Sequence, residues 1–283
     1  MASRPPTLWA AVTPVLVGGA AAVAKGHFLP VAFVATLFSS VFIQIGANFA
    51  NDLSDFRRGA DAGPRLGPTR VTQAGLLSPG EVATGTWVVM GLAALFGLYL
   101  VYLRGWPILA IGLASIAAGL LYTGGPWPFG YHGLGDVFAF VFFGVLAVVG
   151  TYYVHAGTVD TLTLLASLPV SFLVTAILVV NNLRDIDTDR AAGKWTLAVL
   201  IGPLATRVEY VLCVAGAMIV PAVLRWTGLV SGLFWLPWLT LPVAVRLVRT
   251  VATETGPALN RALKGTAELE FLFGLLLAVS LVW

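Results

Sequence analysis

Charged side chains are scarce in this sequence. Only 10% of its 283 residues are Asp, Glu, Lys or Arg, whereas a typical soluble domain carries about 25%. Hydrophobic residues make up 58% of the chain, and long apolar runs recur from one end to the other with no long polar block between them. The composition therefore excludes a large soluble core. It predicts an integral membrane protein in which residues 1–283 form a single membrane domain.

Cysteine is almost absent as well. The one cysteine, Cys213, excludes a disulfide within the chain. The excess of positive charge is small, a net charge of +3 at pH 7, and gives no indication of nucleic-acid binding. Nothing in the sequence sets the oligomeric state. The one partner that composition predicts is the lipid bilayer.

The apolar runs are long enough to cross a membrane as helices. About 20 apolar residues span the hydrocarbon core, and the Gly and Pro residues inside these runs are common in membrane helices. We therefore predict an all-α, polytopic membrane protein with about nine transmembrane helices. The predicted spans are 7–25, 29–53, 81–103, 106–124, 135–154, 161–184, 204–224, 229–248 and 266–283.

The basic residues divide unequally between the loops of this arrangement. With the N-terminus inside, thirteen Lys and Arg residues fall on the inner side, and three fall on the outer side, namely Lys25, Arg104 and Arg225. Cytoplasmic loops of membrane proteins carry such an excess of positive charge. One span more or fewer would mix the two sets. The charges therefore support nine spans and place the acidic clusters described next on the cytoplasmic side.

A polar stripe marks the end of the second predicted span. Its members, at i, i+3, i+4 and i+7, are Asn48, Asn51, Asp52 and Asp55. This spacing puts them on one face of a helix whose other faces are apolar. Acidic residues at a membrane edge are costly and are usually functional. Ordinary loop charge is therefore the weaker interpretation of the two aspartates.

A second cluster follows the apolar run 172–180 and contains Asn181, Asn182, Asp185 and Asp189. If the preceding helix continues, Asp185 and Asp189 lie one turn apart on one face. Asp187 points away from that face and is the weaker candidate for a ligand. Converging carboxylates repel each other, so they need a cation between them, protonation or a basic partner.

Basic residues beside these carboxylates indicate a site for a metal ion and a diphosphate. Oxygen ligands suit hard cations, and Mg²⁺ typically uses one or two carboxylates together with substrate phosphates. Arg184 and Lys194 are suited to the remaining phosphate oxygens. Each could instead be a charge that only orients the protein in the membrane.

These segments together resemble the UbiA superfamily of intramembrane aromatic prenyltransferases, and within it the 1,4-dihydroxy-2-naphthoate polyprenyltransferase branch. The motifs that carry the resemblance follow in order: Arg4-Pro-x-Thr-Leu-Trp-Ala-Ala, Asn48-x-x-Asn51-Asp52-x-x-Asp55, Gly67-Pro-x-Arg70-Val-Thr-Gln73-x-Gly75, Tyr122-Thr-Gly-Gly-Pro126, Gly133-Leu-Gly-Asp136 and Asn181-Asn-x-Arg184-Asp185-x-x-x-Asp189-x-x-x-Gly193-Lys194-x-Thr196-Leu197. Many superfamily members have a further Asp where this chain has Gly59. The naphthoate branch commonly lacks it too, so this departure favours that branch and leaves the first cluster with fewer anionic ligands.

The resemblance implies an activity and a location. The activity is transfer of a polyprenyl group from an allylic polyprenyl diphosphate to 1,4-dihydroxy-2-naphthoate, with loss of diphosphate and CO₂, giving demethylmenaquinol in menaquinone biosynthesis. The implied fold places the helices around a central cavity with cytoplasmic caps. The implied location is the inner (plasma) membrane of a bacterial cell, with the active site facing the cytoplasm.

The resemblance also implies roles for individual residues and a Mg²⁺ cofactor. The implied metal ligands are Asp52, Asp55, Asp185 and Asp189, which with Lys194 make up the catalytic set. The implied substrate-binding residues are Asn48, Asn51, Arg70, Tyr122, Asn182, Arg184 and Lys194. Candidates for the acceptor carboxylate are Arg4, Arg70 and Lys194, with Arg70 first. Plausible walls for the isoprenoid chain are Phe138, Phe140, Phe142 and Phe143, although such a stripe more often faces lipid or the core.

Two other functions remain open from the sequence. A sibling prenyltransferase would use 4-hydroxybenzoate or another aromatic acceptor, because acceptor choice depends on pocket residues that motifs do not locate. A cation-coupled membrane transporter belongs to a different class. Transporter acids lie near the bilayer midplane beside broken helices, whereas these acids lie at span ends beside Arg and Lys, which favours phosphate binding.

Overall fold

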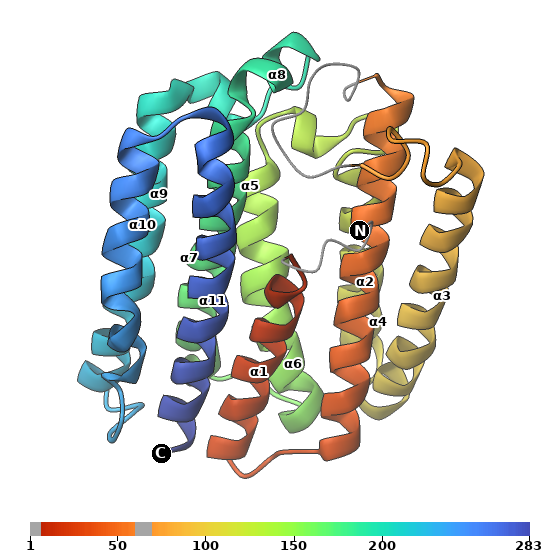
Figure 1. The fold of residues 1–283 in the computed structure, drawn as a ribbon. Helices are drawn as coiled ribbons and strands as arrows, with labels where there is room; N and C mark the ends of the chain where they lie inside the picture. Colours follow the sequence, from red (N-terminus) through yellow and green to blue (C-terminus); the bar gives the residue numbers. More distant parts are fainter. Residues whose placement is uncertain (1–6, 60–69) are drawn as a thin grey trace.

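The computed structural model describes residues 7–59 and 70–283, and no β-strand occurs within these ranges. The α-helices are α1 (Trp9–Ala24), α2 (Pro30–Arg57), α3 (Pro79–Arg104), α4 (Trp106–Leu121), α5 (Gly135–Phe138), α6 (Ala147–Ala156), α7 (Thr161–Arg184), α8 (Ile186–Ala191), α9 (Leu197–Trp226), α10 (Leu241–Thr253) and α11 (Leu259–Val282). Short 3₁₀ segments are η2 (Phe129–Tyr131), η4 (Leu236–Thr240) and η5 (Gly256–Ala258), and a π-helical segment, η3 (Ala139–Leu146), joins α5 to α6. The helices stand side by side in one bundle (Figure 1). The all-α prediction is confirmed.

Six helical segments are long and apolar enough to cross a membrane. Within the described residues they are Pro30–Arg57, Pro79–Arg104, Gly135–Ala156, Thr161–Arg184, Leu197–Trp226 and Gly256–Val282. The helices α1 and α4 are shorter apolar helices of 16 residues each. With 13 residues and two arginines, α10 falls outside both groups. An integral membrane protein is therefore supported, while the count of nine spans stays a prediction.

The predicted helix ends agree with the structure in some places and not in others. The span predicted at 204–224 closely matches the part of α9 that follows a kink at Gly202, whose φ of 80° suits glycine, and a short helical segment from Leu197 precedes that kink. The span predicted from residue 229 begins too early, because no helix occurs in 229–235. Hydropathy cannot separate an apolar loop from an apolar helix. The turn chemistry around these residues, rather than their polarity, sets the ends.

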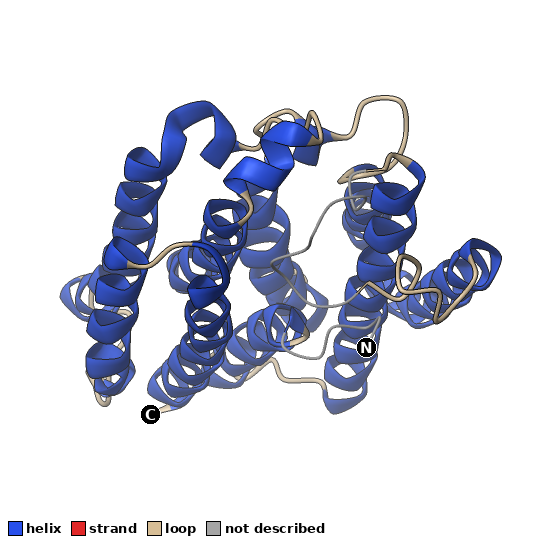
Figure 2. Ribbon diagram, turned by 45° about the horizontal axis from the view of Figure 1, so that its top comes forward, coloured by secondary structure: helices blue, strands red, loops and turns tan. Residues whose placement is uncertain are grey.

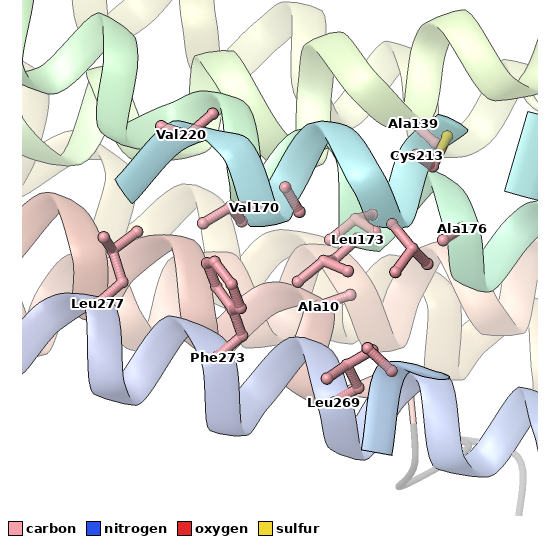
Figure 3. Packing of buried hydrophobic residues seen from close by; sticks show 14 of the residues in the cluster. Ala10, Ala139, Val170, Leu173, Ala176, Cys213, Val220, Leu269, Phe273 and Leu277 are labelled. Atoms are coloured by element: carbon pink, nitrogen blue, oxygen red, sulfur yellow. The ribbon is translucent and has the colours of Figure 1, made fainter. Parts of the chain in front are cut away.

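The largest hydrophobic core joins α1, α7, α9 and α11 (Figure 3). Leu173 of α7 is 1% exposed, and Leu269 and Phe273 of α11 are fully buried. Each contributes to a continuous layer of side chains between the helices. This side of the bundle, called the solid side below, contains α1, α7, α9 and α11.

Small residues bring the helices of the solid side close together. A Cβ atom added at Gly144 of η3 would lie 1.8 Å from Ser171 Oγ on α7. One added at Gly274 of α11 would lie 2.0 Å from Thr13 Cγ2 on α1. Van der Waals packing at small residues is what associates helices in a membrane. These two glycines therefore set the helix spacing at their contacts.

The two ends of the bundle carry different polar groups. The C-terminal end of α2 and the short helix α8 lie at the same end, at the top of Figure 1 and turned forward in Figure 2. This end carries both acidic clusters and is called the motif end. At the opposite end, Lys25 lies 3.9 Å from Asp160, and Arg104 Nε donates to the Val154 carbonyl at 2.8 Å. Lys25 and Arg104, two of the three basic residues predicted on the outer side, thus lie at the end of the bundle opposite the motif end.

Candidate active site

Asp55 lies at the centre of the first motif. It occupies the last turn of α2, is 3% exposed, and both carboxylate oxygens have partners. Arg70 Nη2 lies 2.5 Å from Oδ2, and the Tyr131 hydroxyl donates to Oδ1 at 2.8 Å. Arg70 therefore lies beside the acidic cluster, while its predicted role in substrate binding stays a prediction. The structure also adds Tyr131, which the sequence analysis did not select.

Asp52 has a different environment from Asp55, although the two are three residues apart. Its Oδ2 accepts a hydrogen bond from the Val71 backbone N–H at 3.1 Å, which fixes the segment after residue 70 against α2. Its Oδ1 is buried and has no hydrogen-bond partner. Asp52 thus has one oxygen that supports the loop and one buried oxygen without a partner, and it does not line the cavity that Asp55 borders.

The second motif does not continue the helix as one hypothesis required. The helix α7 ends at Arg184, Asp185 has φ −100° and ψ 8°, and α8 begins at Ile186. The prediction that Asp185 and Asp189 share one face of a continued helix is therefore wrong in its geometry. The cause is local, because Arg184 binds the carboxylate of the next residue through Nε at 2.8 Å and Nη2 at 2.5 Å. Arg184 also donates to Asn181 and to Asn260 of α11.

Asp189 lies in α8, beside the chain reversal at Gly193. Its Oδ1 is 3.5 Å from Lys194 Nζ, while Oδ2 is buried without a hydrogen-bond partner. Burial raises the pKa of Asp189 to about 6, and the ammonium of Lys194 opposes that rise. The Lys194 backbone N–H also donates to the Asp189 carbonyl at 2.8 Å. The Gly193-Lys194 turn thus places a cation directly against this carboxylate.

Tyr131 connects the two motifs. Its hydroxyl binds Asp55, and its ring lies 5.6 Å from Lys194 Nζ, a cation–π distance. Its carbonyl accepts from the Trp195 N–H at 3.1 Å. Burial, and then the charge of Asp55, raise the pKa of the tyrosine, so the hydroxyl stays protonated and donates. The sequence signal that could have identified Tyr131 is its place in the rigid Gly- and Pro-rich loop after Tyr122.

The other predicted substrate-binding residues divide between the cavity and the core. A cavity near the motifs is lined by Asn48, Asn51 and Tyr122. Asn51 Oδ1 accepts from Thr123 at 2.8 Å. Asn182 is 2% exposed and does not line the cavity, whereas its neighbour Asn181 does. A role for Asn182 in direct substrate contact is therefore not supported by its position. Arg4 lies outside the described residues.

The cavity has a volume of about 520 Å³ and begins beside Asp55, Arg70 and Lys194. It follows α2 as far as Thr36, nineteen residues from Asp55. At about 1.5 Å of rise per residue, this distance is about 28 Å. The walls come from α2, α3, α4, η3 and α6, and α1 and α7 of the solid side also border the cavity; most of the lining side chains below the motifs are apolar. The site is therefore a long apolar cavity with a charged end.

The phenylalanine stripe after Gly135 contributes to this wall. Phe138, Phe142 and Phe143 line the cavity, whereas Phe140 packs against Phe172 with ring centroids 5.2 Å apart. Phe138 ends α5, and the other three lie in the π-helical segment η3. Such segments are rare and frequently occur at functional sites. Three of the four predicted wall residues are thus at the cavity.

The carboxylates of the two motifs fit Mg²⁺ by their ligand chemistry. They are all oxygen ligands, and Asp52 Oδ1 and Asp189 Oδ2 are buried without partners. Within the described ranges no three His, Cys, Asp or Glu side chains gather into a ready metal cage. Mg²⁺ does not require one, because it completes its shell with water and substrate phosphates. The donor set therefore suits an ion that binds together with a phosphorylated substrate.

The sequence model of the UbiA prenyltransferase family matches residues 11–264 of this chain. The chain is 36% identical to the 1,4-dihydroxy-2-naphthoate octaprenyltransferase of Escherichia coli (strain K12), over 95% of this chain and 91% of that protein. It is 40% identical to the protein of the same name from Mycobacterium tuberculosis (strain ATCC 25618 / H37Rv), over 90% of this chain and 86% of that one.

Solved structures agree with the sequence match. The fold is similar to that of a UbiA homolog from Aeropyrum pernix K1 in its apo form, with a TM-score of 0.77, 16% identity and 98% of each chain covered. It is also similar to a UbiA homolog from Archaeoglobus fulgidus bound to DMAPP and Mg²⁺, with a TM-score of 0.69, 17% identity, and 99% and 97% of the two chains covered. At these identities the likeness concerns the fold, and the family follows from the sequence: this chain belongs to the UbiA prenyltransferase family.

Proposed function

We propose that this protein transfers a polyprenyl group from a polyprenyl diphosphate to 1,4-dihydroxy-2-naphthoate, releasing diphosphate and CO₂. The observation that carries the proposal is the apolar cavity that ends at Asp55, Arg70 and Lys194. An isoprenoid chain suits the apolar length and a diphosphate suits the charged end. Relatives that are 36% and 40% identical over most of the chain are named for this acceptor.

The basic residues of the motif end bind the diphosphate in this proposal. The two residues proposed for this role, Arg184 and Lys194, each pair with a carboxylate of the second motif, at 2.5 Å from Asp185 and 3.5 Å from Asp189. Charge-assisted hydrogen bonds to phosphate oxygens can replace these contacts. Bound Mg²⁺ supplies neutralisation of the diphosphate and so makes it a better leaving group. The ligands proposed for it are Asp52, Asp55, Asp185 and Asp189.

The cavity protects the reaction from water. Loss of diphosphate leaves an allylic carbocation, which water would consume, and an apolar site excludes water. The electron-rich ring attacks the allylic carbon at its carboxylate-bearing position. Loss of the carboxylate as CO₂ then restores the aromatic ring, so no base has to remove a ring proton. Arg70 is our first candidate for holding the acceptor carboxylate, because a carboxylate in a dry site needs a cationic partner.

Mass spectrometry of the products tests this function. Purified full-length protein is incubated with Mg²⁺, a polyprenyl diphosphate and, separately, 1,4-dihydroxy-2-naphthoate or 4-hydroxybenzoate. We expect a prenylated naphthoquinol that lacks the carboxylate and little product from the benzoate. A prenylated product that keeps its carboxylate, or a preference for 4-hydroxybenzoate, would move the protein to another acceptor class.

We also propose a membrane arrangement for residues 1–283 as one domain. Nine helical passes put the N-terminus and the motif end in the cytoplasm of a bacterial cell, with the inner (plasma) membrane as the location. The thirteen-to-three division of Lys and Arg supports this orientation. Cysteines introduced at Ser54 and Thr188 should react only from the cytoplasmic side, and one introduced at Thr227 only from the outer side. The reverse pattern would overturn the arrangement.

A further inference from the structure

Gln44 is a buried polar side chain that the mechanism above does not use. It lies on α2 one turn before Asn48, is 7% exposed and lines the cavity. Its Oε1 is enclosed and has no hydrogen-bond partner. A buried carbonyl oxygen without a partner is destabilising, and buried polar groups in native proteins are nearly always paired. Because the same side chain lines the cavity, rotation of its amide group would bring Oε1 to a ligand bound there.

Gln44 extends the polar stripe of α2 away from the motif end. It stands at i, with Asn48, Asn51 and Asp55 at i+4, i+7 and i+11, and all four line the cavity. The other three have protein partners. Asn48 Nδ2 donates to Thr7 at 3.1 Å, and Asn51 and Asp55 are bound as described above. The polar stripe of α2 therefore begins at Gln44, one turn before the first residue of the predicted motif.

Beyond Gln44 the polar groups on the cavity wall of α2 are already satisfied. One turn further along α2, the Ser40 hydroxyl donates to the Ala11 carbonyl at 3.0 Å. The Ser39 hydroxyl donates to the Ala93 carbonyl at 3.1 Å, and the Thr36 hydroxyl to Ala32 at 2.8 Å. Among these described side chains of α2, Gln44 is thus the one with a buried polar atom that has no partner.

We propose that Gln44 binds a ring hydroxyl of the aromatic acceptor and so helps to select it. This inference rests on the prenyl-transfer function proposed above. The isoprenoid tail has no polar atom and cannot pair with an amide. The acceptor carboxylate requires a cation, and Gln44 carries no charge. A hydroxyl group can donate to Oε1 or accept from Nε2, so it matches the amide in either orientation.

The distance along α2 assigns the 4-hydroxyl to this contact. Eleven residues separate Gln44 from Asp55, which is about 16 Å of helix. That length leaves room for the diphosphate and the allylic carbon between the carboxylates and the ring. The carboxylate-bearing carbon must face the allylic carbon, so the 4-hydroxyl on the far side of the ring points toward Gln44. A site that bonds a substrate hydroxyl discriminates against analogues that lack it.

The test compares two acceptors and three forms of the full-length enzyme. The acceptors are 1,4-dihydroxy-2-naphthoate and 1-hydroxy-2-naphthoate, which lacks the 4-hydroxyl and serves as a competitive inhibitor. The enzymes are wild type, Gln44→Met, which keeps the length of the side chain, and Ser40→Ala as the control. Ser40 is one turn away on the same face and its hydroxyl is already bonded within the protein. KM for both substrates, the inhibition constant and Tm are measured.

Loss of one neutral hydrogen bond should raise the acceptor KM of Gln44→Met about tenfold, with the donor KM unchanged. The inhibition constant of 1-hydroxy-2-naphthoate should stay within about twofold, because that contact is absent in it. Tm should be equal or higher, since an unpaired buried oxygen is removed. Ser40→Ala should match wild type in both KM values.

Three results would overturn the inference: an unchanged acceptor KM, equal losses of affinity for both naphthoates, or a lowered Tm that accounts for the loss. A different result would contradict the proposed function itself. If the wild-type enzyme makes no prenylated naphthoquinol from 1,4-dihydroxy-2-naphthoate, prenyl transfer to this acceptor is contradicted before any variant is compared.

Discussion

The helices of the solid side and those on the side that borders the cavity overlap in mean hydropathy, since α9 and the α11 segment have values of 1.8 and 1.7. The most apolar window of α7, on the solid side, has a mean hydropathy of 2.3 and is 67% buried. The corresponding windows of α2 and α3 have mean hydropathies of 1.7 and 1.9 but are only 28% and 22% buried. Hydropathy therefore identifies the membrane helices without separating packing helices from cavity walls. Close approaches such as Gly274 of α11 against Thr13 of α1 mark the solid side.

The two sides should respond differently to substitution. On the solid side a change should act on stability and leave the chemistry of the folded enzyme intact. At the motif end and along the cavity a change should act on turnover and leave stability nearly intact. The predictions below test this division, beginning with the largest expected effect.

Replacement of Asp55 or Asp189 by Ala should lower kcat by about 10²–10³-fold, because stabilisation of the leaving group is lost. Steady-state assays with saturating Mg²⁺ measure this effect, and Tm confirms folding. The matched control is Asp187→Ala, since the Asp187 side chain is 97% exposed and lies 3.9 Å from Arg190. Turnover within threefold of wild type for both Asp55→Ala and Asp189→Ala would end the metal assignment.

Leu173→Ala should lower the free energy of unfolding by about 2–5 kcal/mol, because it opens a cavity in the core of the solid side. Leu95→Ala on α3, where the side chain is 62% exposed, should change it by less than about 0.5 kcal/mol. Thermal unfolding in detergent compares the two. A kcat per folded molecule that falls in Leu173→Ala would contradict the division between the two sides.

Substitution of two glycines by alanine should change the free energy of unfolding in opposite directions. Gly144→Ala should destabilise by about 1–3 kcal/mol, because its Cβ would collide with Ser171. Gly112→Ala on α4 meets no atom within 4 Å, so it should stabilise by about 0.5–1 kcal/mol through a lower entropy of the unfolded chain. Equal Tm values for the two variants would show that the close contact at Gly144 does not limit packing.

Tyr131→Phe removes the hydroxyl bound to Asp55 and keeps the ring beside Lys194. Loss of one hydrogen bond to a carboxylate should lower kcat/KM roughly tenfold. Tyr102→Phe is the control, since Tyr102 on α3 is 89% exposed. The link between the two motifs would be disproved by a Tyr131→Phe enzyme as active as the control.

The sequence predicts the class of fold and the two acidic clusters well, because both depend on patterns within single helices. Of the predicted stripe on α2, Asn48, Asn51 and Asp55 border the cavity, and Asp52 does not. Contacts between distant segments could not be predicted in the same way. Tyr131 reaches Asp55 only because the loop after α4 folds back over α2, and one oxygen of Asp52 binds Val71 instead of facing the cavity.

The second motif shows the same limit at short range. Helical periodicity places Asp185 and Asp189 on one face, but Arg184 bonds to its neighbour Asp185 and to Asn260, and α7 ends there. Whether an asparagine faces the cavity depends on the rotation of its helix. For that reason Asn181, rather than the predicted Asn182, borders the cavity.

The central claim is that the cavity holds the isoprenoid chain with its diphosphate at the motif end. Photo-crosslinking with a polyprenyl diphosphate that carries a diazirine in its tail tests this claim most directly. Peptide mapping after irradiation should find the label on cavity residues such as Leu98, Ile116 and Phe142, and excess unlabelled diphosphate should suppress it. Label confined to lipid-facing residues of α9, such as Leu204 and Val208, with Leu98, Ile116 and Phe142 unlabelled, would contradict the claim.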